Sequence, residues 1–147
     1  MNVSKQALPD MSARVAWILG RCLIALLFVP AGIAKLTSPP PFLTHMAQHG
    51  VPGWLLPFVA VLEIGCGAAI LSGILWRPAS AVLGLFCVAT AFLFHFDLSD
   101  HVERTMFLKD LAIAGGLLVV AGSTPPGKKT AGGQVEGTKV EGTNDGP

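Results

Sequence analysis

Four long apolar runs are the feature that most constrains this chain. Each run is close to the roughly 20 residues that a helix needs to cross the hydrocarbon core of a bilayer. None carries the polar stripe that a helix of a soluble bundle needs. Of the 147 residues, 52% are hydrophobic and only 13% are charged, about half the charged share of an ordinary soluble domain. We therefore predict membrane-spanning helices over residues 15–36, 54–75, 79–96 and 106–121.

The pattern predicts an all-α fold, an integral membrane four-helix bundle that occupies residues 15–123. Residues 1–14 form a polar lead, in which Pro9 is expected to act as a helix breaker. From Thr124 onward the sequence turns to Gly, Thr, Lys, Glu and Pro and contains the near-repeat VEGTKVEGT. Such a segment has no apolar face to bury, so residues 124–147 are expected to form a disordered tail.

Charge, cysteine spacing and the first apolar run exclude several other interpretations. The net charge is +1 and no basic patch is present, which argues against a nucleic-acid partner. The first run is long for the core of a signal peptide and holds Arg21, so we expect an uncleaved span. Cys22, Cys66 and Cys87 lie in three different spans without C-x-x-C spacing, so we interpret them as small apolar residues.

The distribution of Lys and Arg predicts the orientation of the spans. Lys35 and Arg104 flank one set of span ends, whereas six basic residues flank the other set. The more basic side is expected to face the cytoplasm, which puts both termini inside. The loops FLTHMAQHG, expected as a short amphipathic helix at the membrane surface, and DLSDHVER are then outside. The six basic residues are Lys5, Arg14, Arg77, Lys128, Lys129 and Lys139.

Charged side chains within the spans are the candidate functional residues, because such groups are rare in membranes and usually face the bundle interior or a cavity. Helical spacing puts small residues beside Glu63 and beside Lys109, so both are expected to face neighbouring helices. Estimated depths place Glu63 between Lys109 and Arg21, and we predict that Lys109 enters the bundle to pair with Glu63. Asp110 is expected to pair with Lys35 or to face the outer water. The candidates for a polar pocket are Arg21, Lys35, Glu63, His95, Lys109 and Asp110.

Two interpretations of these charges remain open. A buried ion pair often does no more than fix helix register and the choice of partner helix. Alternatively, the charges line a small polar pocket in the outer leaflet, suited to a quinone headgroup or a small oxyanion.

The histidines do not predict a metal or haem site. His45 and His49 are spaced as i and i+4, but no carboxylate completes a recognisable motif, so we interpret them as surface residues. Haem ligation between spans would need two histidines on facing helices, and only His95 lies near a span. No bound metal is therefore expected.

Four segments together resemble the DoxX family of small membrane proteins. They are GRCLIALLFVPAGIAKL, LEIGCGAAILSGILWRPAS, FLFH and FLKDLAIAGGLLVV, and they follow one another over about residues 18–121. The resemblance implies a four-helix bundle in the bacterial cytoplasmic membrane. It also links the chain to thiosulfate–quinone oxidoreductase and to membrane assemblies that handle sulfur and oxidative stress. The residues that map onto the shared pattern are Arg21, Gly32, Lys35, Glu63, Gly73, Arg77, His95, Lys109 and Gly116.

Family resemblance specifies a fold better than a reaction. We expect a subunit or accessory of a membrane redox complex, in sulfur, quinone or oxidative-stress chemistry. The alternative is a non-enzymatic membrane anchor or a component of a small-solute permease, and the sequence leaves open whether the protein is an enzyme. No flavin, haem or iron–sulfur motif is visible, so electron transfer would need a partner subunit or a bound quinone. The expected partners are the lipid bilayer, redox subunits and, in a homo-oligomer, further copies of the chain.

Overall fold

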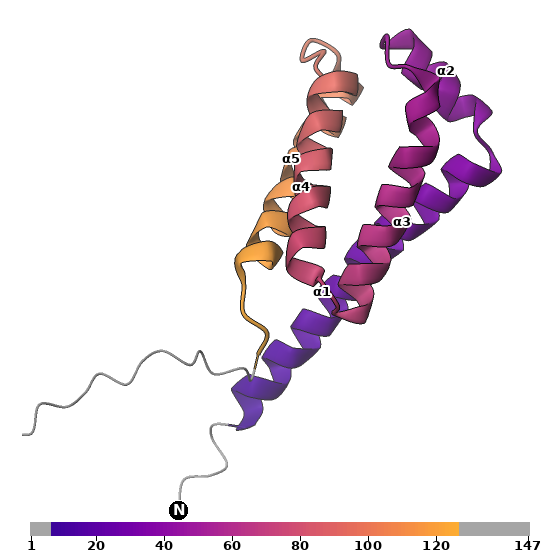
Figure 1. Ribbon diagram of the computed structural model, residues 1–147. Helices are drawn as coiled ribbons and strands as arrows, with labels where there is room; N and C mark the ends of the chain where they lie inside the picture. Colours follow the sequence, from indigo (N-terminus) through magenta and orange to yellow (C-terminus); the bar gives the residue numbers. More distant parts are fainter. Residues whose placement is uncertain (1–6, 127–147) are drawn as a thin grey trace, which may run out of the picture.

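The computed structural model describes residues 7–126, and all the elements within that range are helices. This confirms the all-α fold that the sequence predicts. The tail expected over residues 124–147 lies outside the described residues, apart from residues 124–126. Along the chain the elements are α1 (Ala7–Thr37), α2 (Pro40–Gln48), the short 3-10 helix η1 (Gly53–Leu55), α3 (Leu56–Ser72), α4 (Trp76–Phe94) and α5 (His101–Gly122) (Figure 1).

Four segments of the described chain are helical, long and apolar enough to cross a membrane, in agreement with the four predicted spans. Their outer faces carry large exposed apolar side chains, such as those of Leu26, Phe58 and Val119. Lipid tails are as apolar as these side chains, so their exposure carries no penalty in a bilayer. The segments are Met11–Thr37, Gly53–Ser72, Trp76–Phe94 and His101–Gly122.

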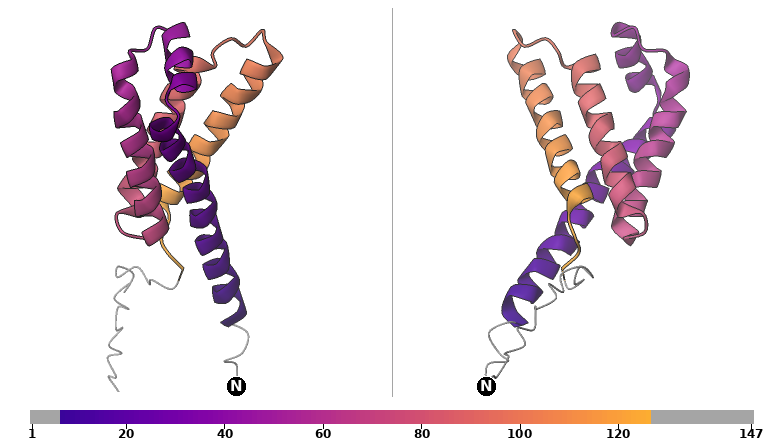
Figure 2. Two further views of the ribbon diagram at one scale, coloured as in Figure 1. Left: turned by 90° about the vertical axis from the view of Figure 1, so that its right-hand side faces the viewer. Right: turned by 60° about the vertical axis from the view of Figure 1, so that its left-hand side comes forward.

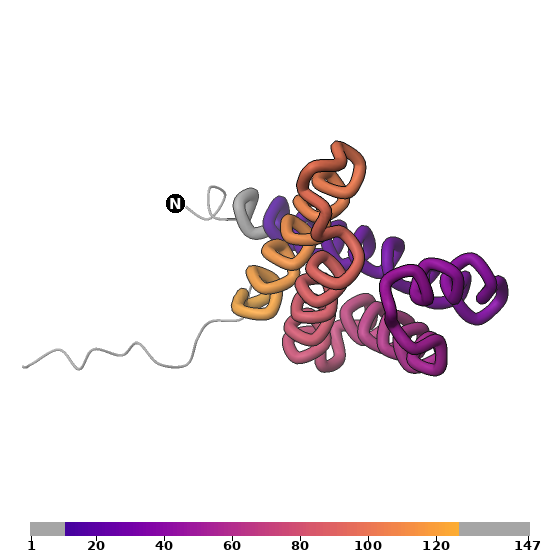
Figure 3. The backbone as a smooth tube through the Cα atoms, turned by 90° about the horizontal axis from the view of Figure 1, so that it is seen from above, coloured from indigo at the N-terminus to yellow at the C-terminus, as the bar shows by residue number. Residues whose placement is uncertain are grey.

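The long helices pack as two pairs. Helix α1 packs along α3, α4 packs along α5, and the contact between α3 and α4 joins the pairs. The two pairs lean apart toward the end that carries α2, while the start of α1 and the end of α5 lie at the opposite end (Figures 1 and 2). Seen from the α2 end, α2 lies beside α3 and away from α5 (Figure 3). The buried core where the pairs meet includes Phe28, Ile70, Leu83 and Leu117.

Two glycines set the close approach of α1 and α3. A Cβ atom on Gly32 would lie 2.7 Å from Cγ1 of Ile64 and 2.8 Å from the carbonyl oxygen of Ala60. A Cβ atom on Gly67 would lie 2.8 Å from Cγ2 of Val29. Contacts this short leave no room for a methyl group, and small residues at membrane-helix interfaces let backbones approach in this way. The α1–α3 contact therefore depends on glycine from both helices.

Among the helix bounds, the starts of α1 and α5 differ most from the prediction. Helix α1 begins at Ala7 and includes Pro9, so the expectation that Pro9 breaks the helix was wrong. Proline is tolerated in a first turn because the N–H groups there have no partner within the helix. Helix α5 begins five residues before the predicted span, because the Asp100 side chain caps it by accepting from the backbone N–H groups of Val102 and Glu103.

Candidate functional site

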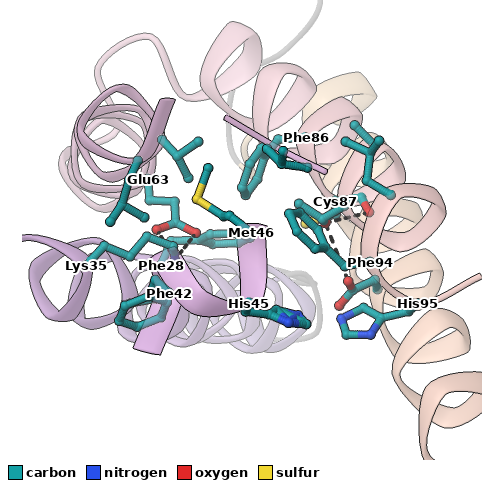
Figure 4. A pocket seen from close by; sticks show the side chains of 18 of the residues that line it. Phe28, Lys35, Phe42, His45, Met46, Glu63, Phe86, Cys87, Phe94 and His95 are labelled. Atoms are coloured by element: carbon teal, nitrogen blue, oxygen red, sulfur yellow. Dashed lines mark hydrogen bonds and ion pairs between the residues drawn. The ribbon is translucent and has the colours of Figure 1, made fainter. Parts of the chain in front are cut away.

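A cavity of about 590 Å³ lies between the α1–α3 pair and the α4–α5 pair. Its lining residues come from the half of the bundle where the pairs lean apart, and α2 contributes Phe42, His45 and Met46 (Figure 4). Most of its wall is apolar or aromatic. The aromatic and sulfur-containing lining residues are Phe28, Phe42, Met46, Phe86, Cys87 and Phe94.

One ion pair lies in the cavity wall that α1 and α3 form. The ammonium group of Lys35 donates to Oε1 of Glu63 at 2.9 Å and to Oε2 at 2.7 Å. The Glu63 side chain is 5% exposed and that of Lys35 is 15% exposed, so the pair is largely screened from solvent. The same ammonium lies 5.2 Å from the centroid of the Phe42 ring on α2. The prediction that Lys109 pairs with Glu63 was therefore wrong.

The position of Lys35 explains this outcome. Gly32 lies one turn earlier on α1, and a Cβ there would be 3.2 Å from Cβ of Glu63. The close approach of the two backbones thus brings the end of α1 alongside Glu63. The expected small-residue face of α3 is confirmed, since Ala60 and Gly67 are buried together with Glu63.

The Lys109 side chain is exposed and lies on the side of α5 away from Phe107. At about 100° per residue, Lys109 is roughly 200° around the helix from Phe107, whose side chain is buried. Its ammonium group donates to the thioether sulfur of Met106 at 3.0 Å. Ala112 and Gly116, which share its face, are exposed. The expectation that this face packs against protein was wrong for the described chain, although Lys109 does line the cavity.

Asp110 faces α4 instead of Lys35. It lies three residues after Phe107 and four before Ala114, which puts it near the buried face of α5. Its Oδ2 atom accepts a long hydrogen bond of 3.4 Å from the Thr90 hydroxyl on α4, and both residues line the cavity. The predicted choice between Lys35 and the outer water was wrong, because the neighbouring helix supplies the contact.

Arg21 caps the end of α3 and does not reach Glu63. Its Nε atom donates to the carbonyl oxygen of Ile70 at 2.5 Å, and a terminal guanidinium nitrogen donates to that of Leu71. These carbonyls belong to the last turn of α3, where carbonyl groups have no partners within the helix. The Ile70 carbonyl also accepts from the Gly73 N–H at 3.3 Å. Gly73 follows in the left-handed conformation, with φ of 79°. Of the six candidates, Arg21 is the one with a helix-capping position away from the cavity lining.

Histidines gather at the α2 side of the cavity. Nδ1 of His95 lies 2.7 Å from a carboxylate oxygen of Glu103. The His45 ring stacks on Phe94 at 5.1 Å between centroids and lies 6.2 Å from the ring of His95. His45 is half-buried and lines the cavity, so its interpretation as a surface residue was wrong. Within residues 7–126, no three His, Cys, Asp or Glu side chains are arranged to hold a metal ion.

Sequence reasoning missed His45, Thr90 and Glu103. Thr90 carried a weak signal, because it is a hydroxyl residue within an apolar run. Glu103 carried none, since its contact with His95 depends on how the loop between α4 and α5 folds back. Five of the six candidates nonetheless line one cavity: Lys35, Glu63, His95, Lys109 and Asp110.

Comparison with known proteins agrees with the sequence resemblance. The chain matches the DoxX family over residues 16–96, which run from within α1 to just beyond the end of α4 and include Lys35, Glu63 and His95. It is 40% identical over 111 residues to the inner membrane protein YqjF of Escherichia coli (strain K12), across 76% of this chain and 85% of that protein. No solved structure matches the chain significantly. The family match and this relative together show that the chain belongs to the DoxX family.

Proposed function

We propose that this protein is a multi-pass protein of the bacterial inner membrane that binds the neutral headgroup of a lipophilic carrier such as a quinone. In this proposal it serves as a subunit or accessory of a membrane redox complex. The cavity between the two helix pairs is the observation that carries the proposal. The four apolar helices and the name of the inner-membrane relative support the location.

The size and lining of the cavity suit a lipophilic small molecule. Its volume of about 590 Å³ is within the range of ordinary small-molecule sites, roughly 300–1,000 Å³. Such sites combine apolar and aromatic walls with a few polar groups that orient the ligand. Here the aromatic rings of Phe28, Phe86 and Phe94 provide flat apolar surface, and the Lys35–Glu63 pair provides a polar group.

The charges of the lining favour a neutral headgroup over an oxyanion. The lining holds two lysines, Lys35 and Lys109, and two carboxylates, Glu63 and Asp110, so their formal charges cancel when histidine is neutral. Lys35 is already neutralised by both oxygens of Glu63. An anion entering the cavity would be repelled by the two carboxylates as strongly as it is attracted by the two lysines, so the lining has no net positive charge to bind it. A neutral carbonyl or hydroxyl can instead accept from or donate to these groups without adding charge.

The redox assignment follows from the family resemblance. DoxX-type proteins are linked to thiosulfate–quinone oxidoreductase, and a membrane-soluble carrier would be the natural ligand for a cavity between spans. A membrane anchor or permease component is the competing function. An anchor needs no ligand, whereas the present proposal requires one.

The test is to purify the protein gently from its own membranes and to identify what accompanies it. Organic extracts analysed by mass spectrometry should contain a quinone in near-equal molar amount to the protein. The double variant Lys35→Met/Glu63→Gln should lose most of this quinone, whereas Arg14→Met, an exposed cation on the same helix, should retain it. Chemical cross-linking before extraction identifies any redox subunit. A preparation with a protein partner but without a lipophilic carrier would favour the anchor.

A further inference from the structure

Two tryptophans and two arginines lie together where α4 begins, at the end of the bundle opposite α2 (Figure 1). The Trp17 ring on α1 packs edge-on against the Trp76 ring of α4, with 4.9 Å between the ring centroids. The guanidinium carbon of Arg77 lies 5.2 Å from the centroid of the Trp76 ring. Arg21 lies one turn after Trp17 on the same face of α1. We name these four residues, Trp17, Arg21, Trp76 and Arg77, the arginine–tryptophan cluster.

Both arginines are positioned by backbone carbonyls and keep free donors. One terminal nitrogen of Arg77 donates to the carbonyl oxygen of Ser123 at 2.8 Å. Arg21 donates through Nε to the carbonyl oxygen of Ile70 and through one terminal nitrogen to that of Leu71. A guanidinium group has five N–H donors, so each arginine retains several that have no acceptor among the described residues. Arg77 is also exposed, which leaves its remaining donors open to a ligand.

The side chains described over residues 11–126 place no carboxylate in this cluster. Glu63 and Asp110 line the cavity, and the other carboxylates of that range lie in the loop before α5 or in its first turn. No ion pair involves Arg21 or Arg77 within the same range. Helix α4 adds positive potential, because it begins here without a side-chain cap on its first N–H groups. The cluster therefore carries net positive charge and presents donors to an anion.

Exposed apolar side chains directly precede the cluster in the turn between α3 and α4. Ile74 and Leu75 are 69% and 71% exposed, and the next two residues are Trp76 and Arg77. Tryptophan is enriched where the hydrocarbon core of a membrane meets the headgroups, and arginine side chains near helix ends reach the same depth. A positive site beside exposed apolar surface suits the phosphate of a lipid better than a free phosphate ion.

We propose that the arginine–tryptophan cluster binds the headgroup phosphate of an anionic phospholipid. The phosphate oxygens accept from the free N–H groups of Arg77, since the planar guanidinium fork matches the geometry of a phosphate. Arg21 and the start of α4 add positive potential, and the acyl chains lie against the exposed apolar side chains of the turn. None of the four cluster residues lines the cavity, so this lipid site is separate from the proposed quinone site.

The test measures which lipid lies beside the two tryptophans of the cluster. The chain contains three tryptophans, and the variant Trp54→Phe leaves only Trp17 and Trp76. This full-length variant is reconstituted into phosphatidylcholine vesicles in which a minor fraction of the lipid carries bromine on its acyl chains. The brominated lipid is either phosphatidylglycerol, which is anionic, or phosphatidylcholine, which is neutral overall. Bromine quenches tryptophan fluorescence at short range, so the quenching reports how much of each lipid lies at the cluster.

The cluster should prefer phosphatidylglycerol to phosphatidylcholine by about tenfold, as expected for arginines beside an anionic headgroup. Arg77→Gln should reduce this preference about fivefold. Arg77→Lys keeps the charge but loses the planar fork, so its preference should fall between the two. Arg104 is the matched control, because it is also exposed and also donates to a backbone carbonyl, that of Leu98, but lies at the other end of the bundle. Arg104→Gln should leave the preference unchanged.

Equal quenching by the two brominated lipids in the Trp54→Phe chain would overturn the proposal, and this comparison remains available if Arg77→Gln does not fold. An unchanged preference in a folded Arg77→Gln variant would overturn it as well. Sodium phosphate separates a lipid from a free ion, since it should lower the quenching by brominated phosphatidylglycerol no more than sodium chloride of the same ionic strength does. A larger effect of phosphate would show that the cluster binds the free ion instead.

Discussion

Lys35 and Glu63 form an ion pair between the end of α1 and the middle of α3, with both carboxylate oxygens within 2.9 Å of the ammonium nitrogen. The pair lies directly beside the glycine contact that holds the two helices together. It also lines the cavity. The same two side chains therefore join α1 to α3 and supply the polar group of the proposed binding site.

The ion pair gives the first prediction. Lys35→Met and Glu63→Gln should each lower the free energy of unfolding, because each leaves a charge without its partner. Breaking a buried pair costs about 3–5 kcal/mol in soluble proteins, and polar contacts in membranes are usually weaker, so we expect on the order of 1–3 kcal/mol. The double variant should recover much of this loss. Reversible unfolding in mixed detergent micelles measures all three values.

Lys109→Met provides the control for this cycle. Its ammonium contacts only the Met106 sulfur among the described side chains, so the variant should change the free energy of unfolding little. It should also show no coupling to Glu63→Gln. Coupling of Glu63 to Lys109 but not to Lys35 would contradict the ion pair.

The glycine contact gives the second prediction. Gly32→Ala should separate α1 from α3, because the new methyl group would lie within 2.8 Å of the Ala60 carbonyl and of Ile64. Overpacking of this kind typically costs about 1–3 kcal/mol, and here it should also lengthen the Lys35–Glu63 contact. Gly20→Ala on the same helix is the matched control, since nothing lies within 4 Å of a Cβ there. Equal free energies of unfolding for the two variants would show that the helices do not approach this closely.

The capping of α3 gives the third prediction. Arg21→Met should destabilise the fold by about 1–3 kcal/mol, because it removes the side-chain donors to the carbonyls of Ile70 and Leu71. Gly73→Ala should also destabilise it, since φ is 79° and a Cβ would lie 2.8 Å from the Arg21 guanidinium. The affinity for a quinone should not change in either variant at temperatures where it remains folded. A specific loss of affinity in Arg21→Met would instead place Arg21 in the binding site.

The sequence predicted the spans and the candidate residues better than it predicted their contacts. The length of each apolar run shows directly that a helix of that length can cross a bilayer, so four spans and an all-α fold could be derived from the sequence. Which side chains pair depends on how each helix is rotated about its axis and on how closely two helix backbones approach. Helical spacing alone therefore does not determine whether Lys35 or Lys109 pairs with Glu63. Gly32 contained the necessary signal, because a glycine one turn before Lys35 permits the approach that brings α1 to Glu63. The contact between His95 and Glu103 depends on the loop between α4 and α5, for which the sequence offers no comparable pattern.

The loop between α4 and α5 gives a prediction about pH. The hydroxyl of Ser99 donates to Asp97 at 2.5 Å and its backbone N–H donates at 3.0 Å, and these bonds hold the pKa of Asp97 below its ordinary value. Because the pKa of Asp97 is lower in the folded loop than in the unfolded chain, the contact stabilises the loop fully at pH values above the unfolded pKa. This stabilisation is lost as the pH falls through the folded pKa. Ser99→Ala should raise the pKa of Asp97 toward that of a free aspartate. Carboxyl chemical shifts followed by NMR during an acid titration measure the change, and an unchanged midpoint would contradict the hydrogen bond.

The last prediction concerns orientation in the membrane. Arg77 at the start of α4 donates to the carbonyl oxygen of Ser123, just after α5, at 2.8 Å, so these two helix ends lie on one side of the bundle. The start of α1 lies at the same end (Figure 1).

In the sequence, more Lys and Arg residues flank the span ends on this side than on the other, and cytoplasmic loops carry the excess of Lys and Arg in membrane proteins. A reporter fused after residue 147 should therefore report the cytoplasm. Because α5 begins at His101, a second reporter belongs within residues 97–100, where it interrupts no helix, and it should report the periplasm. Removing positive charge near this end, with Arg14→Gln and Lys5→Gln together, should shift part of the population toward the inverted orientation. A periplasmic signal from the C-terminal fusion of the unaltered chain would overturn the predicted orientation, while leaving the packing of the four helices unaffected.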